Sequence, residues 1–335
     1  MGPAMSTTPS ITRPDSPLIE VRVARKTREA QDICSFELRP VGGAVLPAFA
    51  AGAHIDVLVP GGLTRPYSLC NAPAERHRYV IGVLREPASR GGSQAMHELV
   101  HEGDTLRIGA PRNNFALAAD ATRSLLLAGG IGVTPILSMA EHLAAAECDF
   151  SMHYCVRSAG RAAFLDRLRA SAFAARAHVH ADDGDLAQRA DLSRLLGDPR
   201  PGLHVYVCGP RGFIDAATAM AAQRGWPQEQ VHREFFGAAD AVASAADESF
   251  EVRLARSGRV VVVPKDQSVV QALATAGVAV PVSCEQGVCG TCLTRVVEGV
   301  PEHRDLYLTP EEQACNDQFT PCCSRSKTPC LVLDL

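Results

Sequence analysis

The chain has 335 residues, which is too long for one ordinary domain and enough for two or three. Hydrophobic residues make up 46% and charged residues 21% of it, so a disordered chain or a coiled coil is excluded. The formal net charge of −4 offers no basic footprint for nucleic acid or an anionic membrane. No run approaches the roughly 18 apolar residues of a membrane span, and the polar, proline-rich start lacks the apolar core of a signal peptide. We therefore expect a cytoplasmic protein that binds neither nucleic acid nor membrane.

Residues 17–118 form a β-rich segment. Short alternating stretches are separated by Pro and Gly, and almost no helical periodicity is present. This pattern predicts a small antiparallel barrel. The expected strands are 18–23, 33–38, 54–59, 79–84 and 105–108.

The pattern changes over residues 119–237. A continuous apolar run at 124–128 is typical of a strand that is buried on both faces. Strand-like and helical stretches then alternate, which predicts βαβ units around a parallel sheet. The strand-like stretches are 150–156, 177–181 and 203–208, and the helical ones are 134–146, 162–174, 186–196 and 212–224.

Residues 238–249 are small, polar and acidic, and we expect them to form an interdomain linker. The last unit, 250–335, begins with a hairpin pattern over 250–263 and a helical stretch over 267–276. With a closing strand at 331–335, these elements fit a β-grasp domain. The predicted fold is therefore multidomain: an antiparallel β-barrel, a parallel α/β domain and a C-terminal β-grasp domain.

The twelve cysteines are concentrated in this last unit, where seven lie within 52 residues. Cys284, Cys289 and Cys292 form a C-x4-C-x2-C loop. Cys322 follows after 29 intervening residues. This spacing is that of plant-type [2Fe–2S] ferredoxins and differs from the paired C-x2-C of zinc ribbons.

The loop also carries two glycines and leaves one choice of ligand. Gly287 and Gly290 lack Cβ atoms, so the backbone can wrap closely around the sulfurs. Only one of the adjacent Cys322 and Cys323 can point into a cluster, and we favour Cys322. A structural zinc, or plain buried thiols, is the alternative to a cluster.

The C-terminal unit resembles a plant-type ferredoxin domain. The order of barrel, α/β domain and ferredoxin domain resembles the phthalate dioxygenase reductase and vanillate demethylase reductase family, over nearly the whole chain. The resemblance implies FMN, NADH and a [2Fe–2S] cluster as cofactors, with FAD as the alternative flavin.

Two further segments resemble the flavin signature of the wider ferredoxin-reductase superfamily. Arg65-Pro66-Tyr67-Ser68-Leu69 is similar to its R-x-Y-S-L motif, in which arginine suits a flavin phosphate, tyrosine the flavin ring or ribityl chain, and serine the N5 region. Gly91-Gly92-Ser93 precedes a helical stretch and suits an anion, although alone it reads equally as a helix cap. The resemblance implies that this segment holds the FMN phosphate together with Gly82-Val83-Leu84.

Three segments resemble the nicotinamide side of the same superfamily. Gly129-Gly130-Ile131-Gly132-Val133-Thr134-Pro135 does not match G-x-G-x-x-G but is similar to the GGIGxTP motif, with Pro135 in a first helical turn. Cys208-Gly209-Pro210 resembles the CGP motif. His232-Arg233-Glu234-Phe235-Phe236 matches the H-x-E-x-F pattern, which implies that Glu234 orients around the reacting rings and Phe236 covers the flavin. The candidate catalytic residues are Ser68, Cys208, Glu234 and Phe236.

The coenzyme preference rests on the segment after the second strand of the α/β domain. Arg157, Ser158 and Arg161 suit the 2′-phosphate of NADPH, but the arginines equally suit a solvated surface. The family resemblance implies NADH.

The resemblance implies the reductase component of a Rieske-type oxygenase system. Electrons would pass from NADH through FMN and the cluster to a terminal dioxygenase or O-demethylating monooxygenase, which docks transiently. The chain lacks the cysteine–histidine pairs of a Rieske centre, so oxygen activation is expected on another protein. We expect a monomer. The alternatives are a stand-alone NAD(P)H-dependent flavin or ferric reductase and a flavoprotein with a zinc-binding interaction module.

Overall fold

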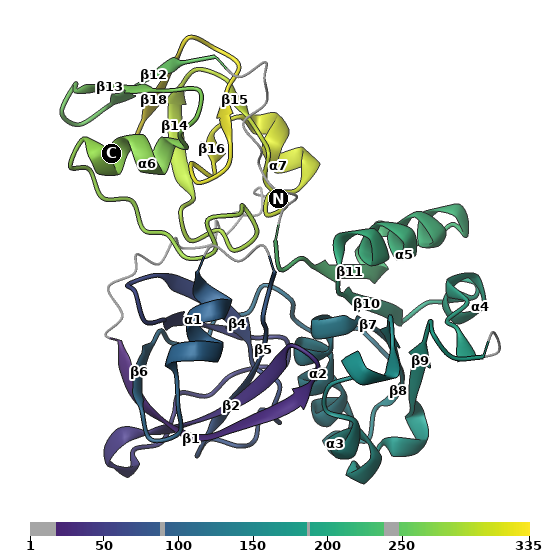
Figure 1. Cartoon of the computed structure of the whole chain (residues 1–335). Coiled ribbons are helices and arrows are strands. Elements are labelled where there is room, and N and C mark those ends of the chain that lie inside the picture. The colour runs from purple at the N-terminus through teal and green to yellow at the C-terminus, as the bar shows by residue number, and fades with distance from the viewer. Residues whose placement is uncertain (1–17, 88–90, 186–187, 238–247) are drawn as a thin grey trace, which may run out of the picture.

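A computed structural model describes residues 18–87, 91–185, 188–237 and 248–335. Its strands form three main sheets and one two-stranded ribbon. Figure 1 shows the C-terminal unit above the barrel and the α/β unit beside the barrel. Within the described ranges, no helix has the length and apolarity needed to cross a membrane.

The first sheet is antiparallel, with strand order β4-β3-β6-β1-β2-β5. Alternation along β1 buries Val21 and Val23 in the barrel core and leaves the intervening Arg22 exposed. A bridge between Leu69 and Ile81 joins the two outer strands, so the sheet closes as the predicted barrel. The elements are β1 (Ile19–Ala30), β2 (Ile33–Pro40), β3 (His54–Leu58), β4 (Thr64–Ser68), β5 (Tyr79–Leu84), α1 (Gly92–Leu99) and β6 (Thr105–Ile108).

The second sheet is parallel throughout, with strand order β11-β10-β7-β8-β9. Its central strand β7 is the predicted apolar run, in which Leu126 and Leu127 are fully buried. The parallel α/β prediction is therefore confirmed. The elements are β7 (Arg123–Gly129), α2 (Val133–Ala145), β8 (Asp149–Val156), α3 (Leu165–Ala170), β9 (Ala177–Ala181), α4 (Leu192–Leu196), β10 (Leu203–Cys208), α5 (Arg211–Gln223) and β11 (Val231–Glu234).

Two helices of this unit are shorter than predicted. The stretch 162–174 contains only α3, because Phe164 adopts a left-handed conformation with φ 59° just before the helix. The stretch 186–196 contains α4, which begins after Asp191, whose side chain accepts a hydrogen bond from the Arg194 backbone N–H. Residues 186–187 lie outside the described residues.

The C-terminal sheet has strand order β13-β12-β18-β14-β16, and the parallel pairing of β12 with β18 joins the start of the domain to its end. The hairpin, the helix and the closing strand are as predicted. The elements between them were not predicted: β15, β16 and β17 have two residues each, too few for a periodic pattern, whereas the five-residue β14 and the six-residue α7 were missed. The elements are β12 (Phe250–Leu254), β13 (Val260–Val263), α6 (Val269–Thr275), β14 (Thr294–Glu298), β15 (Pro301–Glu302), α7 (Pro310–Cys315), β16 (Gln318–Phe319), β17 (Arg325–Ser326) and β18 (Cys330–Leu333).

The proposed domain boundaries stay predictions. Most of the expected linker, 238–247, lies outside the described residues. The helix α7 did carry a sequence signal that was missed: Thr309 and Glu312 form a capping box around Pro310.

Candidate functional site

The two predicted flavin segments meet at one place on the barrel. A Cβ atom at Gly92 would lie 2.7 Å from Cγ of Arg65, so only glycine lets the start of α1 pack against this arginine. Gly91 has a φ of 95°, in the left-handed region that favours glycine. Ser93 faces the end of β5, where its hydroxyl accepts a hydrogen bond of 3.1 Å from the Glu86 N–H. A cation beside a helix start is suited to a phosphate, so these residues fit the phosphate end of a flavin mononucleotide.

The strand β5 is placed differently. A Cβ atom at Gly82 would lie 2.7 Å from Cγ2 of Thr134 and 3.1 Å from Cζ of Phe164. Val83 is buried in the barrel core, and Leu84 packs against the core of the α/β unit. Gly82 therefore serves the packing of the barrel on the α/β unit, and the contribution of these three residues to FMN binding stays a prediction.

The two glycine motifs of the nicotinamide side lie against each other at the carboxyl ends of β7 and β10. A Cβ atom at Gly132 would lie 2.3 Å from the carbonyl oxygen of Cys208, and one at Gly209 would lie 2.8 Å from Cα of Gly129. The chain runs outward from β7 through β8 and β9, and then returns to the other side of β7 as β10. The motifs therefore lie at the switch point of the sheet, where open α/β sheets bind their ligands.

The remaining residues of the GGIGxTP motif have two roles. Some form the first turn of α2, and Gly130 leaves its backbone open to a ligand. Thr134 and Pro135 lie buried in the first turn of α2, where the Thr134 hydroxyl donates to the Ile131 carbonyl at 3.0 Å. Gly130 has a φ of 52°, and a Cβ atom there would meet nothing within 4 Å. Pro210 caps α5, which begins directly after the CGP motif. This combination of open backbone and helix starts fits a dinucleotide.

Three of the four candidate catalytic residues meet where the barrel adjoins the α/β unit. The Ser68 hydroxyl at the end of β4 donates a hydrogen bond of 3.4 Å to Oε2 of Glu234 at the end of β11. Cys208 pairs in register with Glu234 across β10 and β11. Phe236, two residues beyond β11, is 38% exposed, and its covering of the flavin ring stays a prediction.

Burial sets the protonation of this group. It raises the pKa of Glu234 to about 8, against the smaller opposing effect of the Ser68 hydrogen bond. Burial and the neighbouring Glu234 carboxylate raise the pKa of Cys208 well above its usual value. Near neutral pH the pair is therefore uncharged, and the protonated Glu234 carboxyl has a proton to donate. Pro66 and Tyr67 precede Ser68 on β4, and burial also raises the pKa of the Tyr67 phenol.

The four predicted cluster ligands are buried together in the C-terminal unit. The thiol of Cys284 interacts with those of Cys289 and Cys322, and the thiol of Cys322 interacts with that of Cys292. The Gln286 N–H donates to Sγ of Cys284 at 3.3 Å. The four cysteines form a connected set of thiols with backbone donors aimed at the sulfur, as an iron–sulfur cluster requires.

The number and type of these ligands match the cluster. A plant-type [2Fe–2S] cluster takes four cysteine thiolates, which it spreads over two irons. The residues present therefore fit the cluster.

The Cys323 thiol has different neighbours from the four predicted ligands. Its thiol contacts Cys322 but also lies 3.2 Å from the Thr320 hydroxyl and near that of Ser324. A Cβ atom at Gly287 would lie 2.4 Å from the Cys323 sulfur, so this glycine leaves the room that Cys323 occupies.

The second loop glycine is also required by its surroundings. Gly290 has a φ of 70°, and a Cβ atom there would lie 2.2 Å from Cζ of Tyr307. Both the backbone conformation and the Tyr307 ring therefore restrict this position to glycine, while the predicted close wrapping around the sulfurs stays a prediction.

The cluster loop lies against the barrel. Nη1 of Arg65 is 3.5 Å from the carbonyl oxygen of Ser283 and 3.5 Å from Oε1 of Glu285. Asn114 donates to the Cys289 carbonyl at 3.4 Å. The arginine of the flavin motif thus touches the residues on both sides of Cys284. These contacts could not be predicted from the sequence, because they join segments more than 170 residues apart and no motif marks them.

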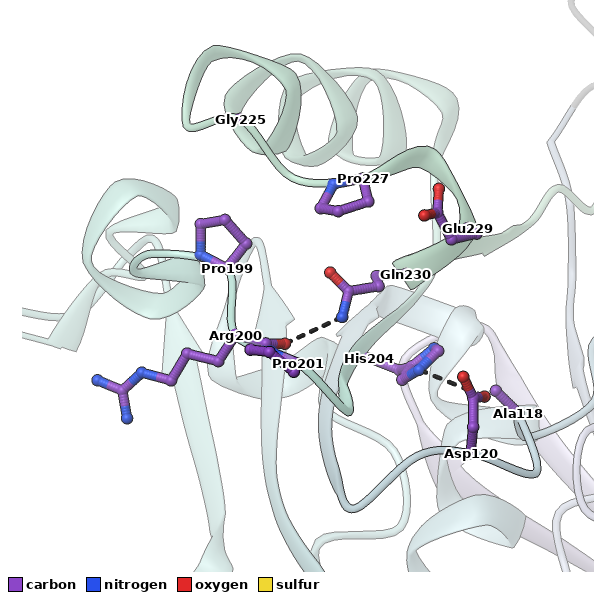
Figure 2. Close-up of a pocket in the computed structure, with 10 residues that line it drawn as sticks. All are labelled: Ala118, Asp120, Pro199, Arg200, Pro201, His204, Gly225, Pro227, Glu229 and Gln230. Atoms are coloured by element: carbon purple, nitrogen blue, oxygen red, sulfur yellow. Dashed lines mark hydrogen bonds and ion pairs between the residues drawn. The ribbon is translucent and has the colours of Figure 1, made fainter.

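A cavity of about 570 Å³ lies elsewhere, between Ala118, Pro201, His204 and Pro227. Figure 2 shows Asp120 next to His204, with 3.6 Å between the carboxylate and Nε2, while the side chain of Arg200 points away. His204 is near the start of β10, so the cavity is at the opposite end of the sheet from the glycine motifs. It is not the nicotinamide site.

Comparisons with known proteins identify the family. Residues 252–327 match the model of the 2Fe-2S iron-sulfur cluster binding domain, and residues 109–231 match that of the N-terminal domain of dimethylamine monooxygenase subunit DmmA-like proteins. The vanillate O-demethylase oxidoreductase of Pseudomonas putida is 57% identical over 319 residues, which cover 95% of this chain and 100% of the relative. The chain belongs to the phthalate dioxygenase reductase and vanillate O-demethylase reductase family.

Two further relatives agree with this family. The phthalate 4,5-dioxygenase oxygenase reductase subunit of Pseudomonas putida is 43% identical over 316 residues, or 94% of this chain and 96% of the relative. The solved phthalate dioxygenase reductase, described as a modular structure for electron transfer from pyridine nucleotides to [2Fe–2S], has a TM-score of 0.76 at 40% identity and covers 95% of this chain and 98% of its own.

Family membership confirms the predicted fold and the main prediction of function. The chain is an NADH-dependent iron–sulfur flavoprotein oxidoreductase with FMN and a [2Fe–2S] cluster as cofactors. It is the reductase of an oxygenase system.

Proposed function

We propose that this chain supplies electrons to a Rieske-type oxygenase that removes methyl groups from methoxylated aromatic acids such as vanillate. Vanillate O-demethylase oxidoreductases are 57%, 53% and 48% identical to this chain over at least 90% of its length, whereas the phthalate 4,5-dioxygenase reductase subunit is 43% identical. The reductase works as a monomer and docks transiently, since an electron carrier must release its partner between deliveries.

The observation that carries the electron-transfer part of this proposal is the position of the cluster loop on the barrel. Arg65, which we assign to the flavin phosphate, contacts Ser283 and Glu285 on either side of Cys284. A ferredoxin unit that merely shared a chain with a flavoprotein would have no reason to place its ligand loop on the flavin motif. The contact supports a continuous route from flavin to cluster within one chain.

The four cluster ligands are assigned as Cys284, Cys289, Cys292 and Cys322. The thiol contacts of Cys322 with Cys284 and Cys292 support the choice of Cys322. The contacts of Cys323 with Thr320 and Ser324 support its exclusion.

The remaining site residues bind the flavin and the nicotinamide and orient the reacting rings. When bound, the flavin accepts a hydride from NADH and releases electrons singly, and the cluster carries one electron at a time. Gly130, Gly132 and Gly209 keep the backbone open at the switch point for the nicotinamide. Ser68 holds the Glu234 carboxyl at the junction, where the protonated acid would be able to donate a hydrogen bond to a bound ring.

The test reconstitutes the holoprotein with the oxygenase component of a vanillate O-demethylase and measures NADH consumption together with loss of the methoxy group. We expect demethylation to require this reductase and to be lost in Cys292→Ser, while NADH still bleaches the flavin of that variant. The proposal is wrong if NADH oxidation supports no demethylation. It is equally wrong if Cys292→Ser reduces the oxygenase as well as the native chain, since that result indicates a stand-alone flavin reductase.

A further inference from the structure

One ion pair on the barrel lies directly beneath the cluster loop. Asp56 is on β3, and Arg112 follows β6, with 2.5 Å between Nη2 of Arg112 and Oδ2 of Asp56. Arg112 is fixed to the barrel by two backbone hydrogen bonds of 2.9 Å to His54. A backbone hydrogen bond of 2.8 Å joins the Asp56 carbonyl to the Gly109 N–H. The barrel therefore holds both charged groups at defined positions.

Each member of the pair contacts the cluster loop. The Ser283 hydroxyl donates to Oδ1 of Asp56 at 2.5 Å, and Nη1 of Arg112 donates to the Thr291 hydroxyl oxygen at 2.9 Å. Ser283 immediately precedes the ligand Cys284. Thr291 lies between the ligands Cys289 and Cys292. The ion pair thus forms hydrogen bonds with the loop at two residues, each next to a cluster ligand.

The contact with Thr291 extends to a ligand sulfur. The Thr291 hydroxyl oxygen lies 3.2 Å from Sγ of Cys289. Since Arg112 occupies a lone pair of that oxygen, the hydroxyl proton is available to the sulfur. A hydrogen bond to a ligand sulfur stabilises the additional negative charge of a reduced cluster and raises its reduction potential.

We propose that Asp56 and Arg112 are positioning residues that hold the cluster loop on the flavin barrel, and that Arg112 keeps the reduction potential of the cluster high through the hydroxyl of Thr291. This inference rests on the assignment of Cys289 and its partners as cluster ligands. It adds a function for two barrel residues that belong to neither the flavin nor the nicotinamide motif.

The pair differs from an ordinary surface salt bridge. The Asp56 and Arg112 side chains are 20% and 37% exposed, whereas Arg169 and Asp166 on α3 form a pair that is 72% and 100% exposed. Charge-assisted hydrogen bonds that share partners stabilise one another, while isolated exposed pairs contribute little. Loss of Arg112 is therefore expected to lower the equilibrium constant for holding the cluster loop on the barrel by about tenfold or more.

The test compares full-length holoprotein variants Arg112→Gln, Thr291→Val and Thr291→Ser, with Arg169→Gln as the matched control. Three quantities are measured: the cluster potential by EPR-monitored titration, the rate of flavin bleaching by NADH, and the subsequent rate of cluster reduction. We expect Arg112→Gln and Thr291→Val to shift the potential to more negative values. Thr291→Ser, which keeps the hydroxyl, is expected to retain the native potential. Arg112→Gln is also expected to slow cluster reduction about tenfold while flavin bleaching stays within about twofold of native.

A double variant separates the coupling of Asp56 and Arg112 from general destabilisation. If Asp56 and Arg112 act as one unit, Asp56→Asn combined with Arg112→Gln slows cluster reduction no more than the more severe single variant. The proposal is overturned if Arg112→Gln and Thr291→Val match Arg169→Gln in both potential and cluster reduction, or if the two single effects simply add. Absence of an EPR signal in the native reduced holoprotein would instead refute the ligand assignment itself.

Discussion

Replacement of Gly132 by alanine tests the closest approach between the two nicotinamide motifs. The added Cβ would lie 2.3 Å from the Cys208 carbonyl oxygen, 2.4 Å from its carbon and 2.6 Å from the Gly209 nitrogen. Ordinary contacts at such a Cβ begin at 3.4 Å, so the loops must separate by on the order of 1 Å. Gly132 has a φ of −61°, which alanine adopts without strain, and the whole effect is therefore steric.

The expected cost follows from this overlap. The obstructing atoms are backbone, which cannot rotate away as a side chain can, so we expect about 1–3 kcal/mol of destabilisation. For a domain of this size that corresponds to a fall of roughly 2–12 °C in the melting temperature. The displaced backbone also belongs to the proposed nicotinamide site, so the NADH concentration for half-maximal flavin bleaching should rise.

Thermal unfolding and stopped-flow flavin bleaching at several NADH concentrations measure both effects. Gly212→Ala is the matched stability control, because Gly212 lies in α5 of the same unit and its added Cβ meets nothing within 4 Å. It should leave the melting temperature unchanged or slightly raised. A Gly132→Ala variant with native stability and native NADH dependence would refute the close packing of the two motifs.

Three further predictions concern the junction and the cluster. The pKa of Glu234 is about 8 in the folded protein against an ordinary 4.5, so the free energy of unfolding falls as pH rises between these values. Glu234→Gln should escape this loss and be more stable than the native protein by about 2 kcal/mol near pH 9. The full shift corresponds to roughly 5 kcal/mol, and the expected effect is smaller because the side chain is partly accessible to solvent. Equal pH dependence of unfolding in the two proteins would contradict the buried acid. Cys322→Ser should lose the cluster absorbance while Cys323→Ser keeps it, and the reverse result would reassign the fourth ligand. Gly290→Ala should lower cluster occupancy on iron analysis, because its Cβ overlaps the Tyr307 ring at 2.2 Å; full occupancy would show that the loop adapts.

The sequence predicted those parts of the site whose chemistry demands a local pattern. Four thiolates around two irons require the spacing from Cys284 onward, and close backbone approach requires glycine at Gly132. The ordering of strands and helices was likewise readable, because burial on one or two faces imposes distinct periodicities. The structure placed β7 and the closing β18 close to their predicted bounds.

Contacts between distant segments could not be predicted in this way. Asp56 and Arg112 lie in ordinary barrel sequence, and only the folded chain brings them to Ser283 and Thr291. The early start predicted for α3 failed for a related reason, since tertiary packing places buried Phe164 in a left-handed conformation. Both cases reflect tertiary structure that overrides or adds to local preference.

The central claim is that one chain carries electrons from NADH through FMN to a [2Fe–2S] cluster. Anaerobic titration of the purified holoprotein with NADH, followed by absorbance and EPR together with metal and flavin analysis, tests it most directly. We predict about one FMN and about two irons per chain, flavin bleaching on addition of NADH, and a rhombic EPR signal of about one spin per chain. Stoichiometric zinc without iron, or bleached flavin with no EPR signal from a cluster, would contradict it.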